Sequence, residues 1–198
     1  MNRTFRTILV AGVFSVTLAS CTSPEGGNPT AAPTTGTSAT ATTSSSASSG
    51  GPDLDIGKFV AAPCAILTPE QIAAVSTIRE AKAAESETGP GCTYQGKDVL
   101  ENSTFKVVFS TKGKPFDELM AEGKAKFPIF DKKEIAGIPA AVFDSTDGSK
   151  SCNAVMRASD KTSVLVQGTI AKNDKLNPGK PCSTVEQVAT TVAGTLKG

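Results

Sequence analysis

Four widely spaced cysteines restrict the folds open to this chain of 198 residues more than any other feature. They are Cys64, Cys92, Cys152 and Cys182. The chain has no histidine and none of these cysteines belongs to a Cys-x-x-Cys pair, whereas zinc sites usually draw ligands from such close pairs. We therefore predict two disulfides, with no metal and no cofactor. Because disulfides persist in oxidising compartments, we also expect an exported protein.

Four cysteines allow three pairings, and the sequence alone leaves all three open. The expected secondary structure favours one of them. Cys64 and Cys182 each precede an expected helix, whereas Cys92 and Cys152 each begin an expected strand. We therefore expect the disulfides Cys64–Cys182 and Cys92–Cys152, the first of which would close most of the domain into one loop.

The N-terminus has the three parts of an export signal. Two arginines precede an apolar run over residues 7–18, which is too short to span a bilayer but suits a signal peptide. Residues 18–21 (Leu-Ala-Ser-Cys) resemble a bacterial lipobox. We predict a lipoprotein signal peptide over residues 1–20 and lipidation of Cys21, with ordinary secretion as the alternative. Lipidation would anchor the chain on the extracytoplasmic face of the cell membrane.

The segment after Cys21 has the composition of a linker. Residues 22–52 contain one charged residue and no Ile, Leu, Val, Phe or Tyr, so they cannot bury enough apolar surface to fold. We predict that residues 21–52 are the lipidated cysteine and a disordered Ser/Thr-rich tether, either a plain spacer or an O-glycosylated stalk. Residues 53–198 have the length of one domain. The chain has 20 basic and 19 acidic residues, a balance that gives no case for nucleic-acid binding.

Capping motifs and hydrophobic periodicity predict the elements of this domain. Thr68 and Gln71 form a capping box that predicts a short helix, and Pro115 begins a second helix. Ser183 and Glu186 form another capping box before a helix with one apolar stripe. Strands are expected over 92–96, 103–110, 140–143, 152–158 and 163–170, with a polar excursion over 79–91 and a turn at Gly137. The predicted fold is α+β: an antiparallel β-sheet of four or more strands, with the C-terminal helix and two shorter helices packed on it.

Several short motifs follow one another along the expected domain. They are Pro-Cys-x-hydrophobic-Leu-Thr at 63–68, Gly-Cys-x-aromatic at 91–94, Gly-x-Pro-Ala at 137–140 and Pro-Cys at 181–182. Together with the lipobox they resemble the actinobacterial lipoproteins grouped as domain of unknown function 3558, with Tyr94 where tryptophan is more usual. The resemblance implies a lipid-anchored domain built like small extracytoplasmic sensor or ligand-binding domains. It implies no activity and no catalytic residue.

The sequence shows no constellation of catalytic residues. The lack of histidine excludes Ser-His-Asp and Cys-His mechanisms, and no phosphate-binding or nucleophile-elbow motif occurs. The Ser-Lys pairs at 149–150 and 161–163 fit solvated turns, and Asp144 and Asp147 fit turn formers. We therefore expect that the protein is not an enzyme.

Two groups of residues are candidates for binding. The interleaved acidic residues favour a solvated face for a group of six lysines, over a basic patch for phospholipid or an acidic wall polymer. Six phenylalanines would line a groove for a lipid or small ligand, although a core role is favoured. The groups are Lys112, Lys114, Lys124, Lys126, Lys132 and Lys133, and Phe105, Phe109, Phe116, Phe127, Phe130 and Phe143.

These observations leave two hypotheses for the function. We expect an accessory or interaction protein of the cell envelope, held on the membrane through Cys21, with an envelope protein or a cell-wall component as candidate partner. The alternative is an extracytoplasmic module that binds a small molecule or a lipid. A preformed cavity would favour the binding module, and an exposed apolar patch would favour the interaction protein.

Overall fold

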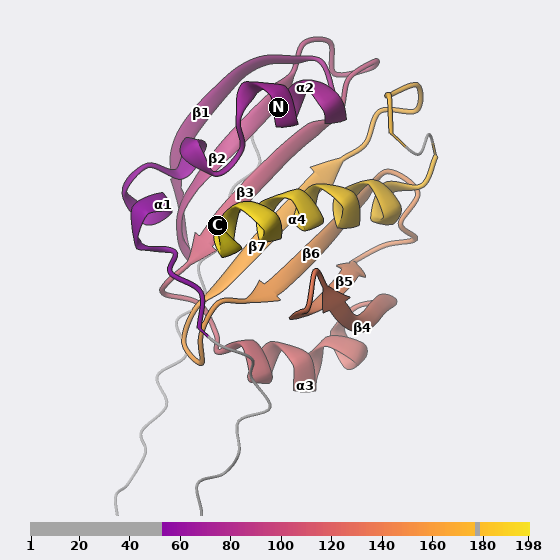
Figure 1. The fold of residues 1–198 in the computed structure, drawn as a ribbon. Coiled ribbons are helices and arrows are strands. Elements are labelled where there is room, and N and C mark those ends of the chain that lie inside the picture. Colours follow the sequence, from indigo (N-terminus) through magenta and orange to yellow (C-terminus); the bar gives the residue numbers. More distant parts are fainter. Residues whose placement is uncertain (1–52, 177–178) are drawn as a thin grey trace, which may run out of the picture. The chain divides into compact units, whose positions relative to one another are not determined.

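The computed structural model describes residues 53–176 and 179–198, so the predicted signal peptide, Cys21 and the tether lie outside the described residues. The helices are α1 (Gly57–Ala61), the 3₁₀ helix η1 (Pro63–Ile66), α2 (Pro69–Val75), α3 (Phe116–Lys126) and α4 (Pro181–Lys197). The strands are β1 (Ile78–Ser86), β2 (Gly89–Gly96), β3 (Thr104–Ser110), β4 (Ile129–Ile135), β5 (Ile138–Asp144), β6 (Ser151–Arg157) and β7 (Ser163–Thr169). Figure 1 shows their arrangement.

The seven strands form one antiparallel sheet in the order β1-β2-β3-β7-β6-β5-β4. The predicted α+β class with an antiparallel sheet is therefore confirmed. Residues Ala136 and Gly137 both have positive φ, which is the backbone of a two-residue turn between β4 and β5. The predicted turn at Gly137 is thus confirmed as well.

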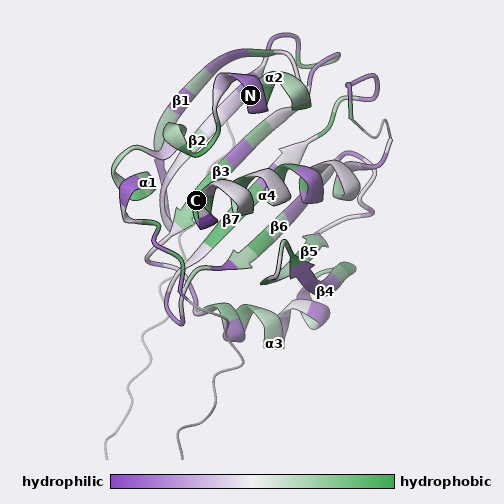
Figure 2. Ribbon diagram, viewed as in Figure 1, coloured by the Kyte–Doolittle hydropathy of each residue, from purple (hydrophilic) through white to green (hydrophobic). Residues whose placement is uncertain are grey.

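The main core lies between the sheet and α4. Val185, Val188 and Val192 on α4 are buried against inward-facing residues of β6 and β7. A Cβ added to Gly168 on β7 would lie 2.5 Å from Val185 Cγ2, so this glycine permits the close approach of the helix. Figure 2 shows hydrophobic stretches on the strands that pass beneath α4. The core therefore lies on one face of the sheet, together with η1.

Two helix starts test the predicted capping boxes. Thr68 and Gln71 form the predicted box at α2, with the Gln71 side chain 2.8 Å from the Thr68 backbone nitrogen. The second prediction is wrong, because α4 begins at Pro181 and its N-cap residue makes no side-chain hydrogen bond. Proline suits the first helical position, where no N–H partner is needed. Glu186 instead pairs with Lys133 of β4 at 2.8 Å.

The disulfides are Cys64–Cys92 and Cys152–Cys182, each with Cα atoms 4.9 Å apart, so the predicted pairing of Cys64 with Cys182 and Cys92 with Cys152 is wrong. Strands β2 and β6 are separated in the sheet by β3 and β7. At about 4.8 Å per strand, that separation exceeds the roughly 7 Å that a disulfide can bridge. Each bond instead joins a strand to the helical segment above it, η1 to β2 and α4 to β6.

Strand β1 occupies most of the segment that the sequence indicates as a polar excursion. All its residues except the first and last are exposed, and it pairs only with β2. An edge strand exposed on both faces has no hydropathy alternation to reveal it. The short helices α1 and η1 were likewise not predicted.

Candidate functional site

The face of the sheet opposite α4 carries one described helix, α3, and we call it the open face. Side chains alternate between the two faces of a strand, so buried Ala154 and Val166 face α4 while Val155 and Leu165 face α3. Phe116 begins α3 and is buried in a small second cluster with Ala141 and Val155. The open face is therefore covered at one end by α3.

A hollow of about 240 Å³ lies between α3 and the open face, and we call it the apolar pocket. Its lining residues are Thr88, Ser110, Gly113, Lys114, Leu119, Met120, Phe127, Phe130, Phe143, Val155, Ser163 and Leu165. The Phe127 and Phe143 rings lie 4.6 Å apart, and Phe130 lies 6.3 Å from each of them. All three rings are only half-buried, so they present aromatic surface to the hollow.

The chain builds this aromatic group from three elements. Phe127 is the C-cap residue that directly follows α3, whereas Phe130 and Phe143 are a cross-strand pair of β4 and β5. Gly123 of α3 lies directly against Phe130, because a Cβ at this position would lie 2.1 Å from the ring. The glycine thus sets the distance between α3 and the sheet.

A second hollow of about 370 Å³ lies beside the apolar pocket, and we call it the polar shelf. Its lining residues are Thr93, Thr104, Phe105, Lys106, Asp144, Ser145, Ser151, Asn153, Gln167, Gly168 and Thr169. The Gln167 side-chain amide donates to Asn153 Oδ1 at 3.2 Å, and the Asn153 amide donates to the Phe143 carbonyl at 3.4 Å. These bonds hold the two amides in place on the surface.

Asp144 closes one end of the polar shelf. Its carboxylate accepts hydrogen bonds from Thr146, from the Gly148 backbone and from the Ser151 hydroxyl, at 2.9 Å for Ser151. Burial alone would raise the pKa of Asp144, but these hydrogen bonds outweigh it and hold the pKa below its ordinary value. Asp144 therefore organises the 145–149 loop, as a turn former would.

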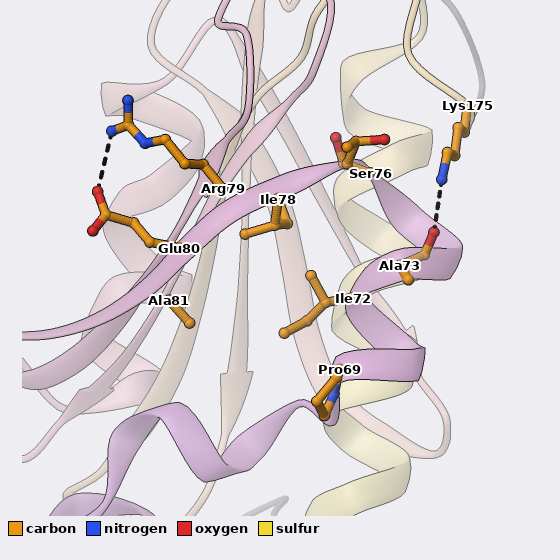
Figure 3. Close-up of a pocket in the computed structure, with 10 residues that line it drawn as sticks. Pro69, Ile72, Ala73, Ser76, Ile78, Arg79, Glu80, Ala81 and Lys175 are labelled. Carbon is orange, nitrogen blue, oxygen red and sulfur yellow. Dashed lines mark hydrogen bonds and ion pairs between the residues drawn. The ribbon is translucent and has the colours of Figure 1, made fainter.

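A hollow of about 410 Å³ lies between α2 and β1 and is more open than the apolar pocket (Figure 3). Ile72 and Ile78 form its floor. Arg79 and Glu80 pair with each other at 3.1 Å, and Lys175 donates to the Ala73 carbonyl at 3.0 Å. A further hollow of about 290 Å³ lies between η1 and β1. The rim groups of the Figure 3 hollow satisfy one another, so we regard it as a weaker site.

The structure divides the two predicted binding groups. Phe105, Phe109 and Phe116 are buried, whereas Phe127, Phe130 and Phe143 line the apolar pocket. Of the six lysines, three form ion pairs: Lys114 with Glu118 and Glu122, Lys126 with Glu122, and Lys133 with Asp131 and Glu186. The lysine group is thus a mixed-charge surface, as the interleaved acidic residues indicated.

Two observations concern chemistry. Within residues 53–176 and 179–198, no group of three or more Cys, Asp or Glu side chains lies close enough together to hold a metal ion. The turn residues Ser159 and Thr162, which flank Lys161 in the sequence, hydrogen bond to each other at 2.7 Å. The polar shelf was not singled out in the sequence, although alternate polar residues in β6 and β7 mark it.

The sequence profile of the family described as "Protein of unknown function (DUF3558)" matches residues 16–195. No curated protein and no solved structure matches the chain. In the described part of the chain, no helix is both long and apolar enough to cross a bilayer.

Proposed function

Because this chain belongs to the DUF3558 family, whose function is unknown, we propose a role from its own geometry: it is a lipid-anchored cell-envelope module that holds the apolar part of a small ligand in the apolar pocket. This is the ligand-binding alternative of the two functions that the sequence leaves open. The single observation that carries it is the group of three half-buried phenylalanines around a hollow.

The sequence and the disulfides support the envelope location. The apolar run before Cys21 has signal-peptide length, and the residues around the cysteine resemble a lipobox. Both disulfides staple helical segments to the sheet, which suits an oxidising compartment. Lipidation predicts that Cys21→Ser moves the chain from the membrane fraction to the soluble fraction. A variant that stays with the membrane would contradict the lipid anchor.

Burial of apolar surface supplies the driving force for binding. The lining of the apolar pocket is mostly apolar, and such a surface favours hydrocarbon or aromatic groups. Each 100 Å² of apolar surface removed from water contributes about 2.5 kcal/mol before the cost of association. The volume of about 240 Å³ lies below the roughly 300 Å³ at which pockets for whole small molecules begin, so the pocket suits part of a ligand.

The test uses the chain from residue 21 onward with Cys21→Ser, kept oxidised, and decanoic acid as the probe. Leu119 lines the pocket from α3, and Leu119→Gln would place a polar amide against the ligand. The matched control is Leu100→Gln, because Leu100 is 78% exposed in the β2–β3 turn. We expect isothermal titration to show binding that Leu119→Gln weakens about tenfold and Leu100→Gln leaves unchanged. Absence of binding, or equal binding by both variants, would refute the proposal.

One observation favours the other hypothesis, an interaction protein. Val99 and Leu100 are the large hydrophobic side chains that are strongly exposed in the described part of the chain, at 67% and 78%. They lie together at the tip of the β2–β3 turn and would suit contact with an envelope protein. The Leu100→Gln control addresses this hypothesis too, since it would impair partner binding and leave ligand binding intact.

A further inference from the structure

We infer that the ligand is one amphiphile with an uncharged, hydroxyl-rich head, an alkyl- or acyl-glycoside in chemical class, whose head lies on the polar shelf while its apolar arm fills the apolar pocket. This inference rests on the proposed function and assigns the ligand of the same face. The shelf and the pocket lie side by side on the open face, and the lining of the shelf is the more polar of the two.

A single cross-strand row joins the two hollows. It runs from β2 to β4 through Thr93, Lys106, Gln167, Asn153, Phe143 and Phe130, each paired in register with the next. The first four side chains are polar and the last two are aromatic. Neighbouring strands lie about 4.8 Å apart, so the change from polar to apolar takes place within one strand spacing. One amphiphile can therefore place its sugar against the polar side chains and its alkyl chain against the aromatic rings of the next strands.

The change from polar to apolar side chains is equally short along the strands. Val155 and Leu165 pair with each other in β6 and β7, two residues away from Asn153 and Gln167. Residues two apart on one strand lie about 6.8 Å apart on the same face. One small molecule can therefore contact the amide pair and the aliphatic pair together.

The hydrogen-bonding groups of the shelf match hydroxyls. Amides and hydroxyls each donate and accept, as sugar hydroxyls do, whereas ammonium groups only donate. Gln167 and Asn153 are held by hydrogen bonds at 3.2 and 3.4 Å, which leaves a further amide hydrogen on each for a ligand. Within the described ranges, the hydroxyls of Thr93 and Thr169 make no hydrogen bond to another protein group. The shelf thus offers both donors and acceptors.

The charges of the shelf argue against an anionic head. Lys106 is the single basic side chain in its lining, and Asp144 contributes a carboxylate. Phosphate and carboxylate recognition typically draws on an arginine fork or several cations, which this lining lacks. A lone hydroxyl or carboxylate would also leave most of a hollow of about 370 Å³ to water. These features select a neutral head of sugar size.

The experiment compares probes on the chain from residue 21 onward with Cys21→Ser. The probes are decyl maltoside, decyl phosphate, decanoic acid and free maltose. Binding is measured by isothermal titration, with the three amphiphiles below their micellar concentrations. We expect decyl maltoside to bind about tenfold more tightly than the two anions, since two net hydrogen bonds contribute about 1.4 kcal/mol. Free maltose should bind much more weakly than decyl maltoside.

Variants separate the head from the arm. Gln167→Leu should lower the affinity for decyl maltoside about tenfold and leave decanoic acid unchanged. The matched control Gln187→Leu lies on α4, which packs on the other face, and should change neither. Leu119→Gln should weaken both probes.

Three results would overturn the inference in distinguishable ways. If the anions bind as tightly as decyl maltoside, the head assignment is wrong and the proposed function stands. If maltose alone binds as tightly as decyl maltoside, the ligand is a free sugar, and the use of the pocket is wrong. If no probe binds, the proposed function fails with the inference.

Discussion

At the scale of single residues, Asp174 joins three segments that are distant in the sequence. Its buried carboxylate accepts hydrogen bonds from the Ser76 hydroxyl at 2.7 Å, from the Ser103 backbone and from the Lys175 backbone. Burial alone would raise the pKa of Asp174. The hydrogen bonds from Ser103 and Ser76 have the larger effect, so the pKa lies below its ordinary value. The ionised form therefore ties the end of α2 and the start of β3 to the 171–176 loop.

This network predicts a pH-dependent stability. The contribution of Asp174 is present above the unfolded-state pKa of about 4 and is lost as pH falls through the lower folded-state pKa. Asp174→Asn should reduce the free energy of unfolding at pH 7 by roughly 1.5–3 kcal/mol, because an amide NH₂ would replace one acceptor oxygen and face a donor in either orientation. The difference from wild type should shrink at pH 3. Urea unfolding at pH 7 and pH 3 measures this difference, and Asp117→Asn at an exposed position is the control. An equal loss of unfolding free energy at the two pH values would contradict the role of the Asp174 charge.

A substitution at Gly123 tests the close contact between α3 and the sheet. A Cβ there would lie 2.1 Å from the Phe130 ring, so Gly123→Ala should destabilise the fold by about 1–3 kcal/mol, against the usual helical gain from alanine. Gly194→Ala in α4 is the matched control, because nothing lies within 4 Å of its added Cβ. We expect it to stabilise by about 0.5–1 kcal/mol. Thermal unfolding of both variants distinguishes them, and two stabilised variants would contradict the Gly123–Phe130 contact.

At the scale of helices and strands, the hydropathy pattern reveals a strand when one of its two faces is buried. Strands β3, β6 and β7 were predicted to within one residue at each end, because every second residue, on the face toward α4, is buried. The exposed edge strand β1 gives no such signal. Strand order is not encoded locally either, and this is why the disulfide pairing failed: Cys92 and Cys152 both lie in strands, but two strands separate them.

The lengths of the two disulfide loops predict how much each disulfide stabilises the fold. The closed loops have separations of 28 and 30 residues, so in the chain-entropy treatment each bond contributes about 3–4 kcal/mol. The pairs Cys64→Ala/Cys92→Ala and Cys152→Ala/Cys182→Ala should each lower the free energy of unfolding by an amount of that order. Non-reducing peptide mapping should recover the same two links. A peptide joining Cys92 to Cys152 would contradict the strand order, because β3 and β7 lie between their strands.

The candidate site was predictable only in part, for the same reason. The sequence singles out Phe127, Phe130 and Phe143 within a larger set, but it does not tell which phenylalanines face the core and which face a hollow. Asn153 and Gln167 lie at alternate positions of two strands that are adjacent only in the folded sheet. The polar shelf therefore cannot be predicted until the register of the strands is known, because its residues come from several strands.

At the scale of the whole molecule, the two faces of the sheet have different roles. One face is closed by α4 and η1 and fixed by both disulfides, and it contains the core. The open face carries α3, a half-buried aromatic group and a row of polar side chains. A rigid, stapled face supports a preformed surface on the other side, which is the arrangement that a binding module needs.

The most direct test of the proposed binding face is the location of a bound ligand on the sheet. Amide chemical shifts of the isotope-labelled chain from residue 21 onward, with Cys21→Ser, would be followed during titration with decyl maltoside. We expect shift changes to concentrate on α3 and on the open-face positions of β5, β6 and β7, including Asn153, Val155 and Leu165. Changes centred on the hollow between α2 and β1, or no changes at all, would contradict it.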